Sequence, residues 1–158
     1  MISQEITDIR HFMHQLLSEA SFDRFLLCQA RITMGISWQI DGNIHPGFYD
    51  SDDIPSEEYV LWKEVRPQVY SILRGNRLPL SMKIVLALPA RSARQLMTRA
   101  GETDDAGRIP GMYLNILYQP SGLTLTTGMA RNVFSLDRRP EEVFDDAIRS
   151  FLKKHSLI

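Results

Sequence analysis

Apolar and polar residues alternate along residues 26–40 in the clearest pattern of the chain. Apolar side chains occupy every even position from Leu26 to Ile40, and the odd positions between them are mostly polar. Period-two alternation is typical of a strand with one buried face and one polar face. The pattern predicts one long strand over 26–40 that buries Cys28. Asp41-Gly42 then predicts a hairpin turn and a returning strand over 43–49.

The rest of the chain divides into further helices and strands. Apolar stripes at helical spacing predict helices over 3–20, 63–74, 90–100 and 139–154, alternation predicts strands over 80–88, 112–118 and 123–129, and a polar glycine-rich stretch predicts a loop over 101–111. The order is α-β-β-α-β-α-β-β-α, and its two hairpins require antiparallel pairing. We therefore expect an α+β fold with one mainly antiparallel sheet of about five strands and about four helices.

The second face of this sheet is predicted to be partly apolar. Leu27, Val85 and Leu117 fall on positions opposite the expected core. Four helices with apolar stripes also exceed what one face of a five-stranded sheet can cover. We expect a helix or a second subunit to cover this face. Arg31 would then be partly buried and would need a carboxylate partner, because an unpaired buried charge is costly.

The composition is that of an average globular protein. The 158 residues are 44% hydrophobic and 23% charged, which excludes a disordered or fibrous chain and fits a single globular domain over 1–158. No apolar run is long enough to span a membrane, and no secretory signal is readable at the N-terminus. Cys28 is the one cysteine and cannot form an internal disulfide. These features predict a cytoplasmic protein with no membrane segment.

The charge of the chain is unevenly distributed. Residues 1–58 hold ten acids and three bases, whereas residues 59–100 hold one acid and eight bases. A basic central third suggests contact with an anion, either nucleic acid or a phosphorylated ligand. The alternative is that the acidic and basic thirds face each other within one molecule or across a dimer.

Three bases in this central third are candidate ligand-binding residues: Arg74, Arg77 and Lys83. Arg74 also fits a structural role, since a cation at a helix C-terminus interacts favourably with the helix dipole. A cluster of the three would require the helix end to fold back over the sheet face that carries Lys83. No aromatic residues alternate with these bases, which weakens the case for single-stranded nucleic acid.

Catalytic motifs are mostly missing. The chain has no G-x-S-x-G, H-E-x-x-H, C-x-x-C or G-x-G-x-x-G. His45, Tyr49 and Asp50 lie within six residues and have the chemistry for acid–base catalysis. Alternatively, His45 and Tyr49 stack against Trp38 to close the hairpin end. No metal or cofactor site is predicted, because no set of three ligands is apparent. Whether the protein is an enzyme stays open.

Short motifs spread over nearly the whole chain resemble a known family. They are Ile40-Asp41-Gly42, Phe48-Tyr49, Trp62, Ile72-Leu73-Arg74-Gly75, Pro79-Leu80-Ser81, Thr127-Gly128, Phe134, Asp137 and Phe151-Leu152. The chain resembles a family of small proteins from anaerobic Firmicutes that is catalogued as a domain of unknown function. The resemblance implies a bacterial cytoplasmic protein and brings no activity, cofactor or catalytic residue.

These observations lead to three hypotheses about function. The first is a non-catalytic binding or interaction module, with a homodimer as one arrangement because a long strand can pair with a copy of itself. The second is binding of nucleic acid or a phosphorylated ligand through the basic segment 63–99. The third is a small enzyme with an acid–base site around His45.

Overall fold

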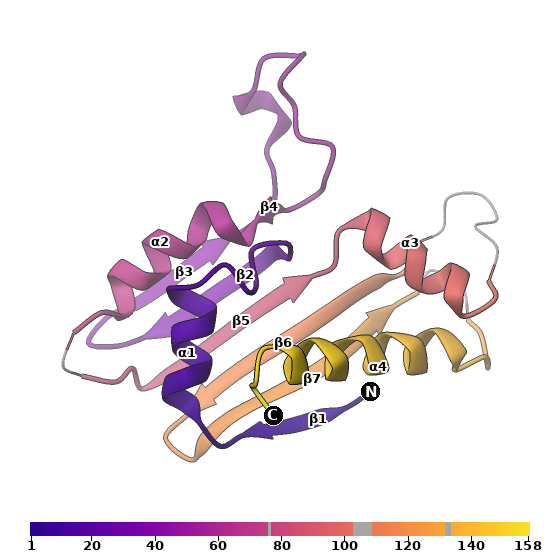
Figure 1. Ribbon diagram of the computed structural model, residues 1–158. Coiled ribbons are helices and arrows are strands. Elements are labelled where there is room, and N and C mark those ends of the chain that lie inside the picture. The colour runs from indigo at the N-terminus through magenta and orange to yellow at the C-terminus, as the bar shows by residue number, and fades with distance from the viewer. Residues whose placement is uncertain (76, 103–108, 132–133) are drawn as a thin grey trace.

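One antiparallel sheet forms the base of the molecule (Figure 1). The computed structural model describes residues 1–75, 77–102, 109–131 and 134–158, so most of the predicted 101–111 loop lies outside the described residues. Of its seven described strands, six follow the order β1-β7-β6-β5-β2-β3, and the seventh, β4, pairs with one end of β2. The strands are β1 (Ser3–Ile6), β2 (Leu26–Thr33), β3 (Ser37–Asp41), β4 (Val60–Leu61), β5 (Ser81–Ala87), β6 (Gly111–Gln119) and β7 (Gly122–Ala130).

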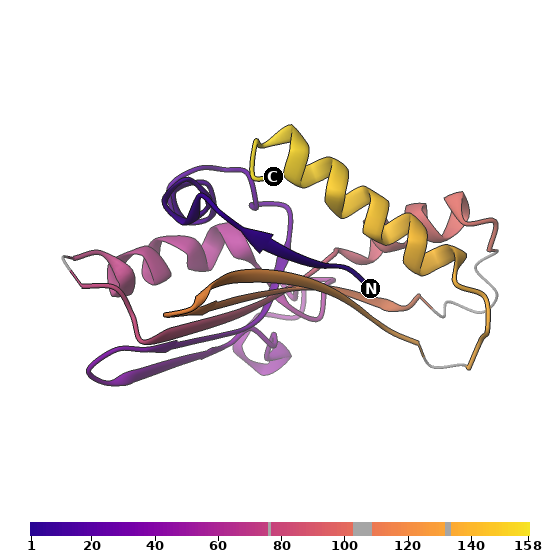
Figure 2. The same cartoon turned by 90° about the horizontal axis from the view of Figure 1, so that it is seen from below.

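The α-helices of the described residues all cover one face of the sheet, which we call the helix face (Figure 2). They are α1 (Ile9–Leu17), α2 (Trp62–Leu73), α3 (Ala90–Arg99) and α4 (Arg139–Lys154), and a short 3₁₀ helix, η1 (Pro46–Phe48), lies in the segment after β3. The core lies between this layer and the sheet, where large side chains such as Phe12, Trp62 and Phe144 are fully buried. Among the described residues, no helix combines the length and apolar character needed to cross a membrane.

The predicted α+β class is confirmed, and β5, β6, β7, α2, α3 and α4 all lie within two residues of their predicted bounds. The sheet is larger than the predicted five strands. β1 accounts for one of the additional strands, in a segment that was predicted to be helical. Asp8 caps α1 by accepting a hydrogen bond from the His11 N–H at 3.1 Å, so the helix begins at Ile9. Ile2 and Ile6 are four residues apart and therefore fit the periods of both a helix and a strand.

The prediction of one long strand over 26–40 is wrong, because the segment folds back as a hairpin. β2 and β3 pair around a three-residue turn at 34–36, with Ala30 opposite Ile40 and Ile32 opposite Trp38. Even-numbered residues of β2 thus pair with even-numbered residues of β3. The alternation of apolar and polar residues therefore continues through the turn without interruption. The expected returning strand over 43–49 is also wrong. This segment contains η1 and belongs to an excursion that projects beyond the end of the sheet (Figure 1).

A bulge in β2 reverses the expected orientation of two side chains. The register between β2 and β5 shifts between Leu27 and Gln29, so Cys28 is an extra residue. Leu27 consequently pairs with Leu86 and is fully buried in the core. Cys28 is half-buried and lies beside Gln29 and Val85, so its predicted place in the core is wrong.

The other face of the sheet, the open face, is covered by none of the described helices (Figure 2). Leu117 and Arg31 are exposed and Val85 is half-buried. Arg31 lies directly opposite Lys83 and forms no ion pair within the described ranges. The predictions of a covering helix and of a carboxylate partner for Arg31 are therefore wrong. The four helices fit on one face because a sheet of seven strands offers more surface than the five strands that were expected.

A buried polar network joins β1, β7 and α4. Asp145 on α4 accepts a hydrogen bond from the Thr127 hydroxyl at 2.6 Å and forms an ion pair with the Met1 ammonium at 3.0 Å. The Thr127 oxygen accepts in turn from the Ile2 N–H at 3.0 Å. Every polar atom named here has a partner, so the network stabilises the docking of β1.

Candidate functional site

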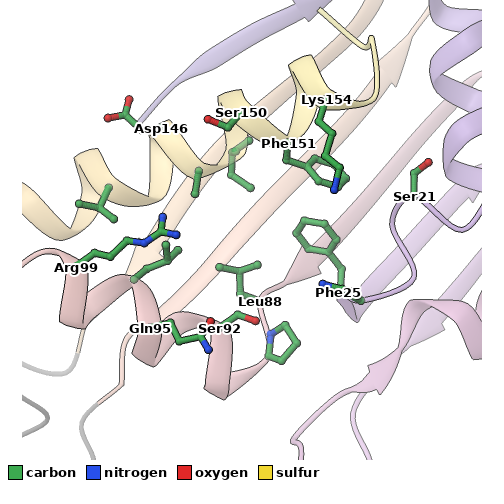
Figure 3. Close-up of a pocket in the computed structure, with 16 residues that line it drawn as sticks. Ser21, Phe25, Leu88, Ser92, Gln95, Arg99, Asp146, Ser150, Phe151 and Lys154 are labelled. Carbon is green, nitrogen blue, oxygen red and sulfur yellow. The ribbon is translucent and has the colours of Figure 1, made fainter.

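A groove lies between α3 and α4 on the helix face (Figure 3). Both helices are amphipathic, and each turns its apolar stripe toward the sheet and toward its neighbour. Their side chains leave a groove of about 1020 Å³, enough for a sizeable small molecule. Its lining comes from four parts of the chain: Ser21, Arg24 and Phe25 before β2, Leu88 and Pro89 after β5, Ser92, Gln95, Leu96 and Arg99 on α3, and Val143, Asp146, Ala147, Ile148, Ser150, Phe151 and Lys154 on α4.

The floor of the groove is apolar and partly aromatic. The rings of Phe25 and Phe151 pack edge to face with centroids 5.4 Å apart, and Phe22 packs edge to face on Phe151 at 5.1 Å. Leu96 and Ile148 continue this surface between the two helices. Because Phe22 is fully buried behind them, the rings of Phe25 and Phe151 have a fixed support. The floor is thus a preformed apolar surface.

Three cations surround this floor: Arg24, Arg99 and Lys154. Figure 3 shows Arg99 reaching from α3 into the gap and Lys154 reaching from α4 toward Phe151. All three side chains are exposed, and none forms an ion pair with a described residue. The single acid of the lining, Asp146, points away from the gap and pairs with Arg149 at 3.0 Å. The groove therefore combines an apolar floor with a surplus of positive charge.

The predicted cluster of Arg74, Arg77 and Lys83 does not form on one face. Arg74 ends α2, and Arg77 lies in the segment between α2 and β5, so both belong to the end of the helix layer. Lys83 points to the open face, beside Arg31 and Leu117. The end of α2 does not fold back over that face. The three bases therefore do not make a common site in one molecule.

An ion pair between described residues joins the acidic and basic thirds of the chain. Arg66 on α2 donates two hydrogen bonds to the Asp23 carboxylate, at 2.9 and 3.1 Å. This bidentate pair is mostly buried and fixes the segment before β2 against α2. Arg74, Arg77 and Lys83 make no such pair in the described part of the chain. Ion pairs among the described residues thus leave these three bases unneutralised.

His45, Tyr49 and Asp50 lie on the projecting excursion after β3. His45 and Asp50 are exposed, at the start of η1 and just beyond its end. The ring of Tyr49 packs on Phe48, with centroids 5.4 Å apart, rather than on Trp38. None of the three lines the groove between α3 and α4.

Cys28 occupies a smaller hollow of about 240 Å³ on the open face, beside Tyr59 and Asp41. Burial raises the pKa of the Cys28 thiol to about 12, although a hydrogen bond with Tyr59 partly opposes this. The pKa of Tyr59 is likewise raised to about 12, chiefly by burial. Nucleophilic cysteines need the opposite shift. This arrangement supports a structural role for Cys28.

The folded protein should therefore react slowly with iodoacetamide at pH 8, because almost none of the Cys28 thiol is ionised. In the unfolded chain the thiol has its ordinary pKa and should react at the usual rate. Since the folded pKa is the higher one, this group's contribution to stability is present below about pH 9 and is lost as the pH rises toward 12. Mass spectrometry of the alkylated protein measures the rate, and rapid modification of the native protein at pH 8 would contradict the raised pKa.

Sequence reasoning found one of the three groove cations, Arg99, as part of the basic segment, and missed Arg24 and Lys154. Lys154 follows Phe151 by three residues, so it borders the apolar stripe of α4. This position at the edge of the apolar stripe is the sequence signal that could have identified Lys154 as a groove residue. Arg24 carries no comparable signal, since it lies between helix and strand.

The chain was compared with family models, with curated proteins and with solved structures. Residues 15–158 match the model of a family of unknown function, DUF5721. No curated protein and no solved structure matches the chain.

Proposed function

Because the chain belongs to DUF5721, a family of unknown function, its role has to be inferred from its own site, and we propose a non-catalytic binding module. The ligand is an amphipathic anion, with an apolar chain and a carboxylate head group, held in the groove between α3 and α4. The apolar chain lies on the floor formed by Phe25, Phe151 and their neighbours. The head group contacts Arg99 or Lys154.

One observation carries this proposal: three cations that pair with no described carboxylate surround a preformed apolar floor. An apolar ligand alone would gain nothing from the cations, and a purely ionic ligand would leave the floor in contact with water. A molecule with both parts satisfies both. Burial of its chain contributes roughly 0.8 kcal/mol per CH₂. A charge-assisted hydrogen bond to the head group adds roughly 1.5–3 kcal/mol.

The chemistry of the lining favours binding over catalysis. Among the described lining residues there is no histidine or cysteine, and the one carboxylate, that of Asp146, forms an ion pair with Arg149. Three serines and a glutamine supply hydrogen bonds, but a serine nucleophile needs a neighbouring base. The hypothesis of an acid–base site around His45 draws no support from this groove. The hypothesis of an anion site in segment 63–99 is narrowed to Arg99, acting together with Arg24 and Lys154.

Dodecanoate should bind the protein in calorimetric titration, and dodecanol, which lacks the charge, should bind more weakly. The double variant Arg99→Gln with Lys154→Gln should bind dodecanoate about tenfold more weakly than the unchanged protein. Its affinity for dodecanol should not change. Ala147→Trp should abolish binding of both ligands, because the indole would fill the space between the helices.

The controls are Arg91→Gln on α3 and Glu142→Trp on α4, which introduce the same residues at exposed positions outside the lining. They should bind like the unchanged protein. Equal binding of dodecanoate and dodecanol would refute a role for the cations. Failure of both to bind, together with salt-sensitive binding of duplex DNA, would favour the nucleic-acid hypothesis instead.

A further inference from the structure

Two exposed apolar surfaces of opposite charge flank β3. The first, which we call the basic tip, lies at the β2–β3 turn and the segment before β5, and consists of Ile36, Trp38, Leu78 and Leu80 with Arg74 and Arg77. The second, the acidic loop, is the excursion over 44–58, and consists of Phe48 and Ile54 with Asp50, Asp52, Asp53 and Glu58. Exposed apolar groups gathered in this way mark interaction surfaces.

The basic tip is a continuous surface because its two segments are hydrogen-bonded neighbours. The Leu80 N–H donates to the Thr33 carbonyl at 2.8 Å, and the Met34 N–H donates to the Ile36 carbonyl at 2.9 Å. Leu80, Met34 and Ile36 therefore lie side by side, just beyond the ends of β5, β2 and β3. Ile36 and Leu80 are 67% and 63% exposed. Residues 31–40 and 70–83 contain no acid, so the tip is uniformly positive.

The acidic loop has the complementary character. Phe48 is 86% exposed at the end of η1, and the loop contains five acids and neither lysine nor arginine. Figure 1 shows the loop projecting from one end of β3, whereas the tip lies at the other end. The two surfaces are therefore separated in one molecule by the length of a strand.

β3 is an edge strand, and no described strand pairs with its outer row of hydrogen-bonding groups. The Gly42 N–H bonds the Cys28 carbonyl and the Met34 N–H bonds the Ile36 carbonyl, so even positions face β2. In an antiparallel pair the alternate residues then direct their N–H and C=O groups away, and these are Ser37, Gln39 and Asp41. The strand contains no proline or lysine that would block further pairing.

We propose that the protein pairs with a second copy of itself through β3. Antiparallel pairing about a two-fold axis beside Gln39 places Ser37 of each copy opposite Asp41 of the other. The acidic loop of each copy then lies against the basic tip of the other copy, twice over, as a symmetric interface requires. Phe48 and Ile54 cover Ile36, Leu78 and Leu80, and the acids face Arg74 and Arg77. This surface shares no residue with the groove between α3 and α4, so it is independent of the proposed function.

The backbone part of this proposal is tested by Gln39→Pro. The N–H that proline removes is directed away from β2, so the fold should survive while pairing between copies is lost. Gln39→Ala keeps the N–H and is the matched control. Sedimentation velocity at micromolar concentration should show a dimer for the unchanged protein and for Gln39→Ala, and a monomer for Gln39→Pro. Circular dichroism verifies that each variant is folded.

The charge part is tested by mixing two variants. Arg74→Glu with Arg77→Glu makes both surfaces acidic. Asp50→Lys, Asp52→Lys and Asp53→Lys together leave two acids and three lysines in the loop, which makes it basic like the tip. Each variant alone should dimerise at least about tenfold more weakly than the unchanged protein. Mixed together, they should form a heterodimer. In it the acidic tip of one variant meets the basic loop of the other, and the remaining loop and tip keep their original charges and attract each other.

Three outcomes would overturn the proposal: a monomer for the unchanged protein at all concentrations, a dimer that survives Gln39→Pro, or variants that do not combine. The main alternative is that the basic tip binds an anionic lipid surface, and pelleting with phosphatidylserine vesicles tests this alternative. If the unchanged protein stays monomeric and pellets with these vesicles, and Ile36→Ser with Leu78→Ser abolishes pelleting, the basic tip binds lipid instead.

Discussion

Replacing Trp62 by alanine should lower the free energy of unfolding by about 3–5 kcal/mol. Trp62 is the first residue of α2 and is fully buried, so its removal leaves a large cavity between α1, α2 and the sheet. Its indole N–H also donates a hydrogen bond to the Leu16 carbonyl at 3.0 Å. Leu16 lies in the last turn of α1, where carbonyl groups lack a partner within the helix. Trp62 thus fills the core and caps a neighbouring helix.

Trp62→Phe separates these two roles, because it keeps most of the apolar volume and loses the hydrogen bond. We expect a loss of about 1–3 kcal/mol, since the Leu16 carbonyl remains buried. The control is Trp38→Ala at the second tryptophan, which is 44% exposed and should change stability by less than about 1 kcal/mol. Urea unfolding followed by circular dichroism at low protein concentration measures all three. Equal losses at the two tryptophans would show that Trp62 is not a core residue.

Gly42→Ala should be the most damaging single-methyl change in the described chain. A Cβ atom at this position would overlap the Leu27 carbonyl oxygen, and backbone cannot move aside as a flexible side chain can. The end of β3 would have to separate from β2 at the bulge, breaking the 2.9 Å bond from the Gly42 N–H to Cys28. Such overpacking costs about 1–3 kcal/mol or more.

Gly35→Ala is the matched control, because a Cβ atom there meets no atom within 4 Å. Its stability should change by less than about 0.5 kcal/mol in either direction. Alkylation of Cys28 gives a second measurement, since opening of the bulge in Gly42→Ala should expose the thiol and speed its reaction at pH 8. If the two variants melt at the same temperature, the close approach of Gly42 to Leu27 is not real.

Gly42 also illustrates what the sequence reveals and what it conceals. Asp41-Gly42 was expected to form a hairpin turn because glycine tolerates positive φ, but this glycine is needed for close contact between strands. The true turn, Met34-Gly35-Ile36, contains two apolar residues that continue the period-two pattern. A turn with an odd number of residues keeps the pattern in phase, so periodicity cannot detect it. The helices α2, α3 and α4 were predictable because an apolar stripe at helical spacing has no comparable ambiguity.

The groove was not predictable, because its cations come together only in the folded molecule. Arg24 and Lys154 lie near opposite ends of the sequence, and α3 must pack beside α4 before they share a site. The sequence indicated an excess of charge in residues 59–100, and Arg99 belongs to it. Two other bases of that segment lie apart from Arg99, since Arg74 follows α2 in the helix layer and Lys83 lies on the open face. Charge totals along a chain therefore reveal an excess of charge without identifying the surface on which it gathers.

The pairing of β1 with β7 has a consequence for the synthesis of the protein. Ile2 and Thr127, which are joined by a hydrogen bond, lie 125 residues apart in the sequence. A ribosome adds about 5–20 residues per second, so β1 waits several seconds or longer for its partner. During that time α1 and the β2–β3 hairpin can form from local contacts, but the first strand has no neighbour. Closure of the sheet at this edge is consequently a late event in synthesis, because β1 has no partner strand until β7 has been made.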